Sequence, residues 1–420
     1  MGRETAILVL TCIMLCVLII PIFSLHVTAS SLDSPNYWPT LGWQYSTPDE
    51  QGMNSTYLNN MMDYIANQNL PIDSVVIVRH GHVILEEYPS GIYSRNSTHE
   101  LASVTKSFSS ALIGIAIGEG HIDSVSHKVL DFFPNRTFAN MNSWKQDMTL
   151  EHLLTMTSGL PWNDPDDQNS MENSADPVQF VLDRAMINEP GSVWRYNSGG
   201  SHLLSAAISK TTGFDALTYA REHLFDPLGI SNVYWRKDKQ DIPWGYAHLF
   251  MKPLDMAKFG YLYLHHGTWD GQQVVPAEWV VESTRPVVRL GDFEGYGYQW
   301  WTDNGTGAYD PYIFDARGGM GQRIVVVPNY DMVVVFTGSF EQGGFDEEDL
   351  LLHEFILKSR VRITGDVYFD WTVDIFDLAA VAISFGEPPP VWNMKADINR
   401  DGIVDIFDVT IVAVDFGKTN

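Results

Sequence analysis

The sequence predicts a mixed α/β (α+β) domain followed by a small α-helical module. Strand-like runs stand at both ends of the first domain: apolar, mainly β-branched residues predominate in 75–79 and 83–86, and again in 324–327 and 332–337. Patterns typical of helices, such as 201–211, lie between these runs. A short repeat follows, because Val373–Asp377 recurs as Val404–Asp408. We therefore expect both ends of the first domain to share one sheet, and the repeat to form a separate module.

Local patterns then predict the individual elements. Apolar spacing and helix-ending residues predict helices over 57–67, 107–120, 150–156, 178–185, 201–211 and 350–358. Runs of β-branched and aromatic residues predict strands over 75–79, 83–86, 299–302, 324–327 and 332–337. The composition changes around 359–365. We assign the first domain to residues 46–358 and the second module to 362–420.

The charge balance disfavours nucleic acid as a partner. The 420 residues contain 26 Lys and Arg against 52 Asp and Glu, a net charge of −26. Such a surface repels phosphate backbones. The acidity either keeps the protein soluble or serves to bind divalent cations, and composition alone leaves both explanations open.

The N-terminus predicts export. Residues 6–23 are apolar and uncharged, Arg3 supplies a weak positive start, and Ala29 ends a small-residue cleavage site. We expect a signal peptide over 1–29 and a secreted or cell-surface protein. An uncleaved anchor is the alternative, and only then would the protein contact a membrane. Cys12 and Cys16, the only cysteines, both lie in this segment, so the mature protein would lack disulfides.

A Ser-x-x-Lys motif, Ser103 to Lys106, opens the helical pattern of the region after it. Residues three apart on a helix share one face, so the hydroxyl and the amine would be neighbours. A serine needs a nearby base to become a good nucleophile, and burial lowers the pKa of a lysine toward neutrality. We expect Ser103 to be a nucleophile and Lys106 its base, although a helix cap with a solvated lysine would have the same spacing.

The segment 99–108, His-Glu-Leu-Ala-Ser-Val-Thr-Lys-Ser-Phe, resembles the active-site segment of the serine β-lactamase-related family. This family includes class C β-lactamases, penicillin-binding proteins and family VIII-type esterases. Segments 151–160 and 190–200 also resemble the family, the second at its Tyr-x-Asn motif. The resemblance covers about residues 46–358. It implies a β-lactamase/DD-peptidase-like sheet with a helical subdomain, and a hydrolase without a catalytic cofactor.

The resemblance also implies catalytic roles. Tyr196 would be the second base, hydrogen-bonded to Ser103 and Lys106. The backbone amides of Ser103 and Gly319 would form an oxyanion hole, in which each donor is worth about 10²–10³ in rate.

Two motifs depart from the family pattern. Ser198 stands where Tyr-x-Asn has its asparagine, and Ala316-Arg317-Gly318 stands where the family has Lys-Thr-Gly or His-Thr-Gly. We expect Ser198, Arg317 and Gly318 to contact the substrate, with Arg317 either binding an anion or pointing to solvent. The departures argue against β-lactam and peptidoglycan substrates and leave esters and amides open.

The C-terminal repeat predicts calcium binding. Oxygen-bearing side chains recur at loop positions 1, 3, 5, 9 and 12 of the second copy, with Gly402 at the sharp turn and a backbone carbonyl at position 7. The first copy is degenerate, with a weaker site or only a solvated loop expected. The expected ligands are Asp366, Asp370, Asp374, Asp377, Asp397, Asn399, Asp401, Ile403, Asp405 and Asp408.

The aspartate at position 12 and the doubled loop resemble type I dockerin modules. In dockerins, positions 10 and 11 contact a cohesin partner. Here those positions are Ile375-Phe376 and Ile406-Phe407, which would either form such an interface or fill the core of the module.

The sequence thus favours a secreted serine hydrolase, acting on ester or amide bonds through an acyl-enzyme on Ser103 and docked to a scaffold by its calcium module. The alternative is a catalytically weak binding protein on the same fold, which the altered motifs at Ser198 and 316–318 suggest. A glycoside hydrolase finds no supporting pair of carboxylates.

Overall fold

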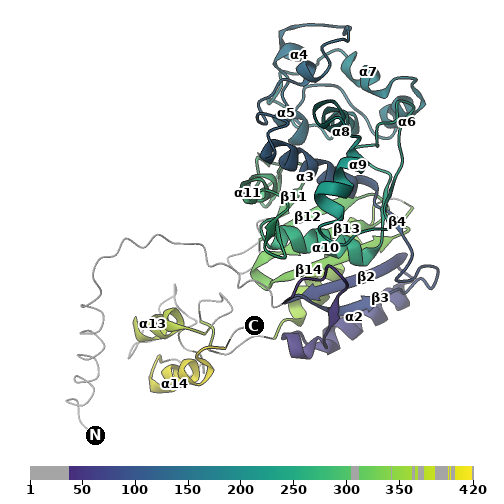
Figure 1. Ribbon diagram of the computed structural model, residues 1–420. Coiled ribbons are helices and arrows are strands. Elements are labelled where there is room, and N and C mark those ends of the chain that lie inside the picture. Colours follow the sequence, from purple (N-terminus) through teal and green to yellow (C-terminus); the bar gives the residue numbers. More distant parts are fainter. Residues whose placement is uncertain are drawn as a thin grey trace. The chain divides into compact units, whose positions relative to one another are not determined.

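The computed structural model describes residues 37–303, 312–341, 343–361, 365–367, 373–383, 396, 398 and 403–418. A nine-stranded sheet forms the centre of the first domain (Figure 1). Its strand order is β1-β3-β2-β14-β13-β12-β11-β10-β9. The strands are β1 (Gln44–Tyr45), β2 (Ile72–Arg79), β3 (His82–Glu87), β9 (Val288–Arg289), β10 (Glu294–Tyr296), β11 (Trp301–Asp303), β12 (Ile313–Gly318), β13 (Gln322–Val327) and β14 (Met332–Gly338).

The two ends of the domain meet in this sheet, which confirms the expectation from the sequence. Strand β2 pairs with β14 in antiparallel register, with Ile77 opposite Val334. Residues before 46 also contact this domain: the Tyr37 hydroxyl donates a hydrogen bond to the Gly81 carbonyl, and the Trp43 indole donates to the Leu254 carbonyl.

Both faces of the central strands are buried. In β2, Val76 and Val78 belong to the larger hydrophobic core, whereas Val75 and Ile77 belong to the smaller one. Alternate side chains of a strand point to opposite faces, so one run of β-branched residues feeds both cores. This double burial explains why the run reads as continuously apolar rather than alternating.

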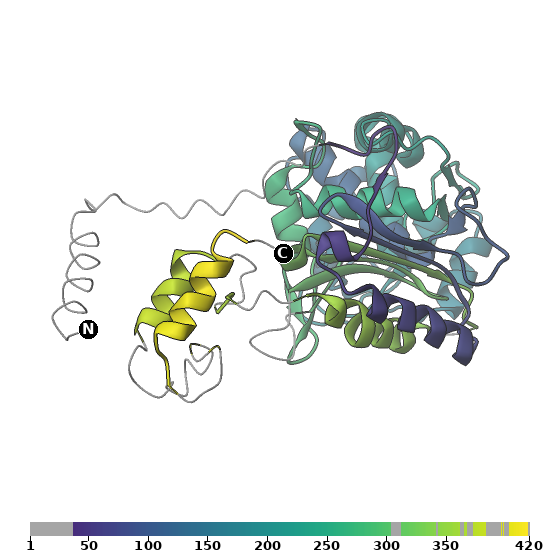
Figure 2. The same cartoon turned by 90° about the horizontal axis from the view of Figure 1, so that it is seen from below.

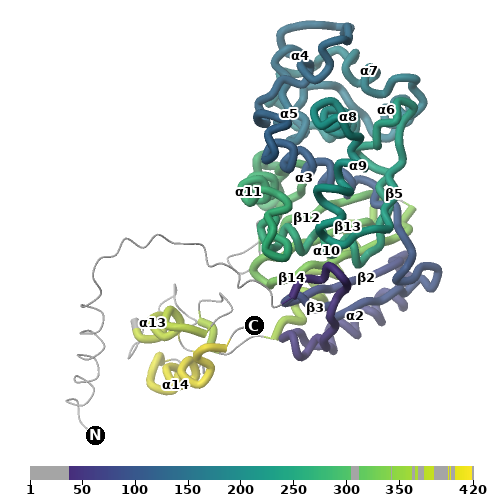
Figure 3. Tube along the Cα trace, viewed as in Figure 1, coloured from purple at the N-terminus to yellow at the C-terminus, as the bar shows by residue number. Residues whose placement is uncertain are grey.

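Helices cover the two faces. On the smaller-core side lie α2 (Ser55–Gln68) and the segment of α12 (Phe345–Leu350), η6 (Leu351–Ile356) and η7 (Leu357–Ser359), beneath the sheet in Figure 2. On the other side lie α3 (Thr105–Gly118) and α10 (Pro253–Leu264). A helical subdomain extends from that side (Figure 3): α4 (Ser143–Asp147), α5 (Leu150–Leu154), α6 (Asp166–Asn173), α7 (Pro177–Leu182), α8 (Ser198–Thr212) and α9 (Ala216–Ala220).

Short elements complete the domain. A three-stranded sheet contains β4 (His99–Glu100), β5 (Tyr234–Trp235) and β6 (Leu249–Met251), and a hairpin contains β7 (Thr268–Trp269) and β8 (Gln272–Gln273). The remaining helical segments are η1 (Asp49–Gln51), η2 (Ala102–Val104), η3 (Val129–Phe132), η4 (Arg221–Phe225), α11 (Ala277–Thr284) and η5 (Pro328–Tyr330).

Most expected elements are present, although several boundaries differ, two of them by tertiary contacts or a change of helix type. The strand expected from 299 begins at Trp301, because Gln299 has a positive φ of 63° and its amide donates to the carbonyls of Leu153 and Leu154. The helix expected over 350–358 begins earlier, at Phe345. Its hydrogen bonding changes from α- to π-helical at Leu351.

The expected signal peptide over 1–29 lies outside the described residues. Among the residues that are described, no helix combines the length and the apolar character needed to span a bilayer.

The C-terminal module contains two packed helices, α13 (Ile375–Ile383) and α14 (Ile406–Asp415). Its small core takes Val373 and Val381 from the first repeat and Val404 and Val412 from the second. The sequence left open whether loop positions 10 and 11 fill this core or form an interface. They are not part of the core, because the side chains at these positions are 58–64 % exposed: Ile375, Phe376, Ile406 and Phe407.

The two repeats share their hydrogen bonds as well as their sequence. Asp377 and Asp408, at position 12, are fully buried. Each accepts a bond of 2.6 Å from the amide at position 2 of its own repeat. The other carboxylate oxygen accepts from the amide at position 9, at 2.8 Å for Asp374 and 2.9 Å for Asp405. Position 12 therefore closes the loop in both copies.

Candidate active site

Ser103 lies in the turn η2, directly before α3. The preceding residue, Ala102, has a positive φ of 44°, a conformation that costs a non-glycine residue about 1–3 kcal/mol and persists only where surrounding packing enforces it. The residues on either side of Ala102 and Ser103 are fully buried, with Leu101 and Val104 at 0 % exposure. Packing on both sides thus holds the candidate nucleophile in a strained turn at the start of a helix.

Lys106 lies against Ser103, as the motif predicts. Its Nζ donates to Ser103 Oγ at 2.9 Å, to the Tyr246 carbonyl at 3.2 Å and to Ser198 Oγ at 3.3 Å. Burial lowers the pKa of Lys106 to about 7, although the charge of Asp164 acts in the opposite direction. A substantial fraction of this amine is therefore unprotonated at neutral pH.

Tyr196 reaches the same site, with Lys106 Nζ 4.7 Å from the centre of its ring. Burial raises the pKa of Tyr196, and a hydrogen bond with Ser103 opposes that rise only in part. Because burial leaves the partner lysine only partly protonated at neutral pH, it offers only a partial positive charge to favour a phenolate. Tyr196 thus keeps its proton at neutral pH, and Lys106 is the better base of the two.

Ser198 connects the lysine to a carboxylate that sequence reasoning missed. Its hydroxyl accepts from Lys106 Nζ at 3.3 Å and donates to Asp164 Oδ2 at 2.8 Å. The Trp162 indole donates to the other oxygen of Asp164 at 2.7 Å. The serine in place of the usual asparagine therefore links Lys106 to Asp164. No motif marks Asp164, which comes from the loop before α6.

Gly318 allows β12 to approach the nucleophile. A Cβ atom at this position would lie 2.4 Å from the Leu101 carbonyl oxygen and 3.0 Å from the Ser103 amide nitrogen. No side chain fits into that space. At Gly319, the next residue, a Cβ would meet nothing within 4 Å. The strand end expected to supply an oxyanion donor thus lies against the Ser103 backbone and beside open space.

Arg317 is engaged by neighbouring acids. Its Nε donates to Asp315 at 2.8 Å and its Nη1 donates to Glu294 at 2.9 Å. The guanidinium also lies over the Trp301 ring, 5.1 Å from its centre. Trp301 in turn stacks on Tyr196 at 6.2 Å between ring centres. Arg317 therefore lies near the site, with its charge balanced by two carboxylates.

A histidine between two glutamates belongs to a hydrogen-bond network that reaches Lys106 through Tyr246. His248 bonds Glu100 at 2.5 Å through Nδ1 and Glu172 at 3.2 Å through Nε2. Burial alone would lower the pKa of His248, but the two glutamates outweigh it and raise the pKa to about 9. Glu172 also accepts from the Tyr246 hydroxyl, and the Tyr246 carbonyl accepts from Lys106. This network positions an acceptor for the lysine.

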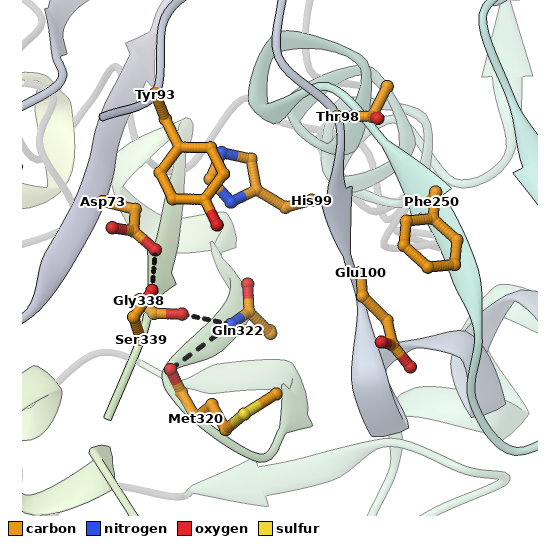
Figure 4. Close-up of a pocket in the computed structure, with 10 residues that line it drawn as sticks. All are labelled: Asp73, Tyr93, Thr98, His99, Glu100, Phe250, Met320, Gln322, Gly338 and Ser339. Carbon is orange, nitrogen blue, oxygen red and sulfur yellow. Dashed lines mark hydrogen bonds between the residues drawn. The ribbon is translucent and has the colours of Figure 1, made fainter. Parts of the chain in front are cut away.

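A cavity of about 330 Å³ lies beside these groups (Figure 4). Its wall includes His99 and Glu100 of β4, just before the nucleophile, and Met320, which follows Gly319. Ser103, Lys106 and Tyr196 are not among its lining residues. The cavity is a neighbour of the catalytic cluster rather than part of it.

The expected calcium ligands are described only in part. Asp366, Asp374, Asp377, Ile403, Asp405 and Asp408 are described, whereas Asp370, Asp397, Asn399 and Asp401 lie outside the described residues. Within the described ranges, no three His, Cys, Asp or Glu side chains gather as a metal-binding group. The described ligands are all oxygen donors, the type that calcium prefers.

The family follows from comparison with known proteins. The model of the beta-lactamase family matches residues 55–356. The chain belongs to the beta-lactamase family. Penicillin-binding protein 4* of Bacillus subtilis is 29 % identical over 216 residues, which cover 48 % of this chain and 42 % of that protein. The chain thus spans less than half the length of this relative.

Solved structures show the same beta-lactamase fold. A D-stereospecific amidohydrolase from Streptomyces sp. has a TM-score of 0.58 at 15 % identity, covering 71 % of this chain and 98 % of that one. A family VIII carboxylesterase has a TM-score of 0.58 at 15 % identity, covering 72 % and 97 %. These likenesses confirm the mixed α/β architecture with its helical subdomain.

Proposed function

We propose that the protein is a serine hydrolase that cleaves ester or amide bonds through an acyl-enzyme on Ser103. The observation that carries this proposal is the contact of Lys106 Nζ with Ser103 Oγ at 2.9 Å, made by an amine whose pKa burial lowers to about 7. A base of that pKa takes up a proton most effectively near neutrality.

Each proton has a carrier in this arrangement. Lys106 accepts the Ser103 proton as Oγ bonds to the substrate carbonyl carbon, and amides near Ser103 and Gly319 stabilise the oxyanion. When the tetrahedral species collapses, the carbonyl–leaving-group bond breaks and Tyr196, protonated at neutral pH, gives its proton to the leaving group. Lys106 returns the proton to Tyr196. Water then releases the acyl group by the reverse sequence.

Esters and unstrained amides are the favoured substrates. The family's Lys-Thr-Gly or His-Thr-Gly position holds Arg317, whose charge Asp315 and Glu294 already balance. A substrate carboxylate would have to displace these acids. This argues against a β-lactam and agrees with the presence of an amidohydrolase and a carboxylesterase among the proteins of the same fold.

Hydrolysis of p-nitrophenyl esters and p-nitroanilides by the full chain tests the proposal, with a chromogenic cephalosporin alongside. We expect ester turnover that falls by at least about 10³-fold in Ser103→Ala, as removal of a nucleophile does. Ser143→Ala is the matched control, because that serine lies in α4, far along the chain from the motif. Equal rates for the wild type and Ser103→Ala would contradict the proposal and favour a binding protein.

The second part of the proposal concerns the C-terminal module. We propose that the protein is exported and that the module is a dockerin-like calcium-binding unit. The support is the oxygen-rich loop pattern and the buried aspartate at position 12, which has the same hydrogen bonds in both repeats. The ten ligands named above, from the two loops, would hold calcium. The bound calcium would neutralise the negative charge that folding of the module brings together.

The partner of the module would be a cohesin-like protein. The support is the exposure of Ile375, Phe376, Ile406 and Phe407, two equivalent apolar pairs at the starts of α13 and α14. Exposed large apolar side chains at equivalent positions suit a protein interface.

A further inference from the structure

The cavity beside the catalytic cluster is lined by groups that accept hydrogen bonds. Asp73 of β2 is 2 % exposed, and its carboxylate accepts a bond from the Ser339 hydroxyl. Gln322, at the start of β13, is also 2 % exposed. None of the ten lining residues is a lysine or an arginine. Buried carboxylates are normally paired with a cation, because an uncompensated charge is costly away from water.

The orientation of the Gln322 amide adds an independent observation. Both hydrogens of its nitrogen are used, by the Gly338 carbonyl at 2.7 Å and the Met320 carbonyl at 3.3 Å. This places the oxygen on the other side, where it has no hydrogen-bond partner. Figure 4 shows that oxygen pointing into the cavity, toward Tyr93 and His99. A buried amide oxygen without a donor is a position that a ligand can complete.

The remaining wall residues add no positive charge. Burial lowers the pKa of His99, against the opposing influence of the Asp73 charge, so the imidazole is neutral at neutral pH. Its ring lies 4.2 Å from that of Tyr93, and Phe250 and Met320 supply apolar surface. The Tyr93 face would favour a cation. A carboxylate, an unsatisfied amide oxygen and an aromatic ring together match a group that donates N–H bonds and carries positive charge.

We propose that this cavity binds a primary ammonium group of the substrate, so that the protein acts on aminoacyl esters or amides. The proposal rests on the hydrolase function given above and deepens it. Position supports the link: the cavity wall holds Met320, next to Gly319, and Glu100, three residues before Ser103. A substrate attacked at Ser103 would place its amine-bearing portion in this cavity.

Matched substrates test the proposal. For the p-nitrophenyl esters of a series of ω-amino acids and their N-acetyl counterparts, we expect the wild type to favour at least one free amine by about tenfold or more in kcat/KM. Asp73→Asn keeps the acceptor for Ser339 and removes the charge, and this preference ratio should fall about tenfold. Glu354→Gln removes an exposed charge elsewhere and should keep the wild-type ratio. Equal rates for each pair, or an unchanged ratio in Asp73→Asn, would overturn the ammonium site while leaving the hydrolase intact.

A binding measurement separates this proposal from the hydrolase function. By calorimetry, hexylammonium should bind the wild-type full chain, bind Asp73→Asn about tenfold more weakly and bind Glu354→Gln as it binds the wild type. 1-Hexanol has the same chain without the charge and should bind at least about tenfold more weakly than the amine. If no ester is hydrolysed but the amine binds through Asp73, the ammonium site stands and the hydrolase proposal fails. Equal binding of amine and alcohol would refute the site in either case.

Discussion

Burial acts in opposite directions on the two proton carriers of the site. It disfavours the charged form of each, so it lowers the pKa of Lys106 to about 7 and raises that of Tyr196. The result at neutral pH is an amine that is partly unprotonated next to a phenol that keeps its proton. Groups whose pKa values are driven apart in this way divide the roles of base and acid between them.

This division predicts the pH profile. The base is the unprotonated form of Lys106, so kcat/KM should rise with pH, inflect near pH 7 and level off above it. At pH 6 the rate should be about tenfold below the plateau. The charge of Asp164 raises the pKa of Lys106, and Asp164→Asn should move the inflection to lower pH.

Rate profiles of p-nitrophenyl ester hydrolysis check this prediction, with Asp147→Asn as a control that removes an exposed aspartate of α4. An inflection that stays in place, or moves to higher pH, in Asp164→Asn would show that the base is not Lys106.

Sequence motifs could identify Ser103, Lys106 and Tyr196, because the first two share a helix turn and the third lies in a segment with a family pattern. Asp164 could not be found in this way. Its contact with Ser198 depends on how the loop before α6 folds back, which no local spacing encodes. Arg317 is a mixed case: Asp315 lies two residues before it on the same face of β12, whereas its second acidic partner, Glu294, comes from β10 and could not be found from local spacing.

The end of strand β12, which would supply an oxyanion donor, lies against the turn that carries the proposed nucleophile. Because a Cβ at 318 would lie 2.4 Å from the Leu101 carbonyl oxygen, Gly318→Ala must push β12 and η2 apart. A displacement of about 1 Å at a reacting centre costs on the order of 100-fold in rate. We expect kcat/KM to fall by about that factor, with a modest loss of stability of about 1–3 kcal/mol.

Steady-state kinetics and thermal unfolding of Gly318→Ala measure both effects. Gly291→Ala is the matched control, because a Cβ there would meet no atom within 4 Å. Full activity of Gly318→Ala would show that the close approach is not needed for catalysis.

The buried β-branched strands were predicted from the sequence, whereas α10, β12 and the shortest strands were missed. β2, β13 and β14 are buried on both faces, which requires the β-branched runs that the sequence displays. β9 and β10 have two and three residues, too few to show any periodicity. The boundary of β11 moved because the tertiary contacts of the Gln299 amide override its local pattern.

At the level of the whole molecule, the module should respond to calcium independently of the hydrolase domain. Among the described residues of the module, seven buried apolar side chains form its core. A core of this size is small, so ligand binding should contribute much of the stability of the module. We expect calcium to raise the unfolding temperature of the module in the full chain, and a chelator to reverse this. Asp408→Asn removes one ligand charge and should weaken calcium binding by about tenfold or more.

Calorimetric unfolding with and without calcium measures the response, and Asp147→Asn again serves as a control for the loss of one acidic charge. An unfolding profile that calcium does not change would contradict the calcium-binding proposal, and it would leave the chemistry at Ser103 untouched.

The pairing of β2 with β14 has a consequence for synthesis. Roughly 250 residues separate the two strands, which a ribosome translating about 5–20 residues per second needs about 10–50 s to produce. During that interval β2, apolar on both faces, has an open edge on the side that β14 will occupy. Such edges recruit other chains. A nascent chain of this protein is therefore most prone to aggregate before its last strand emerges, and a fragment that ends before β14 keeps that exposed edge permanently.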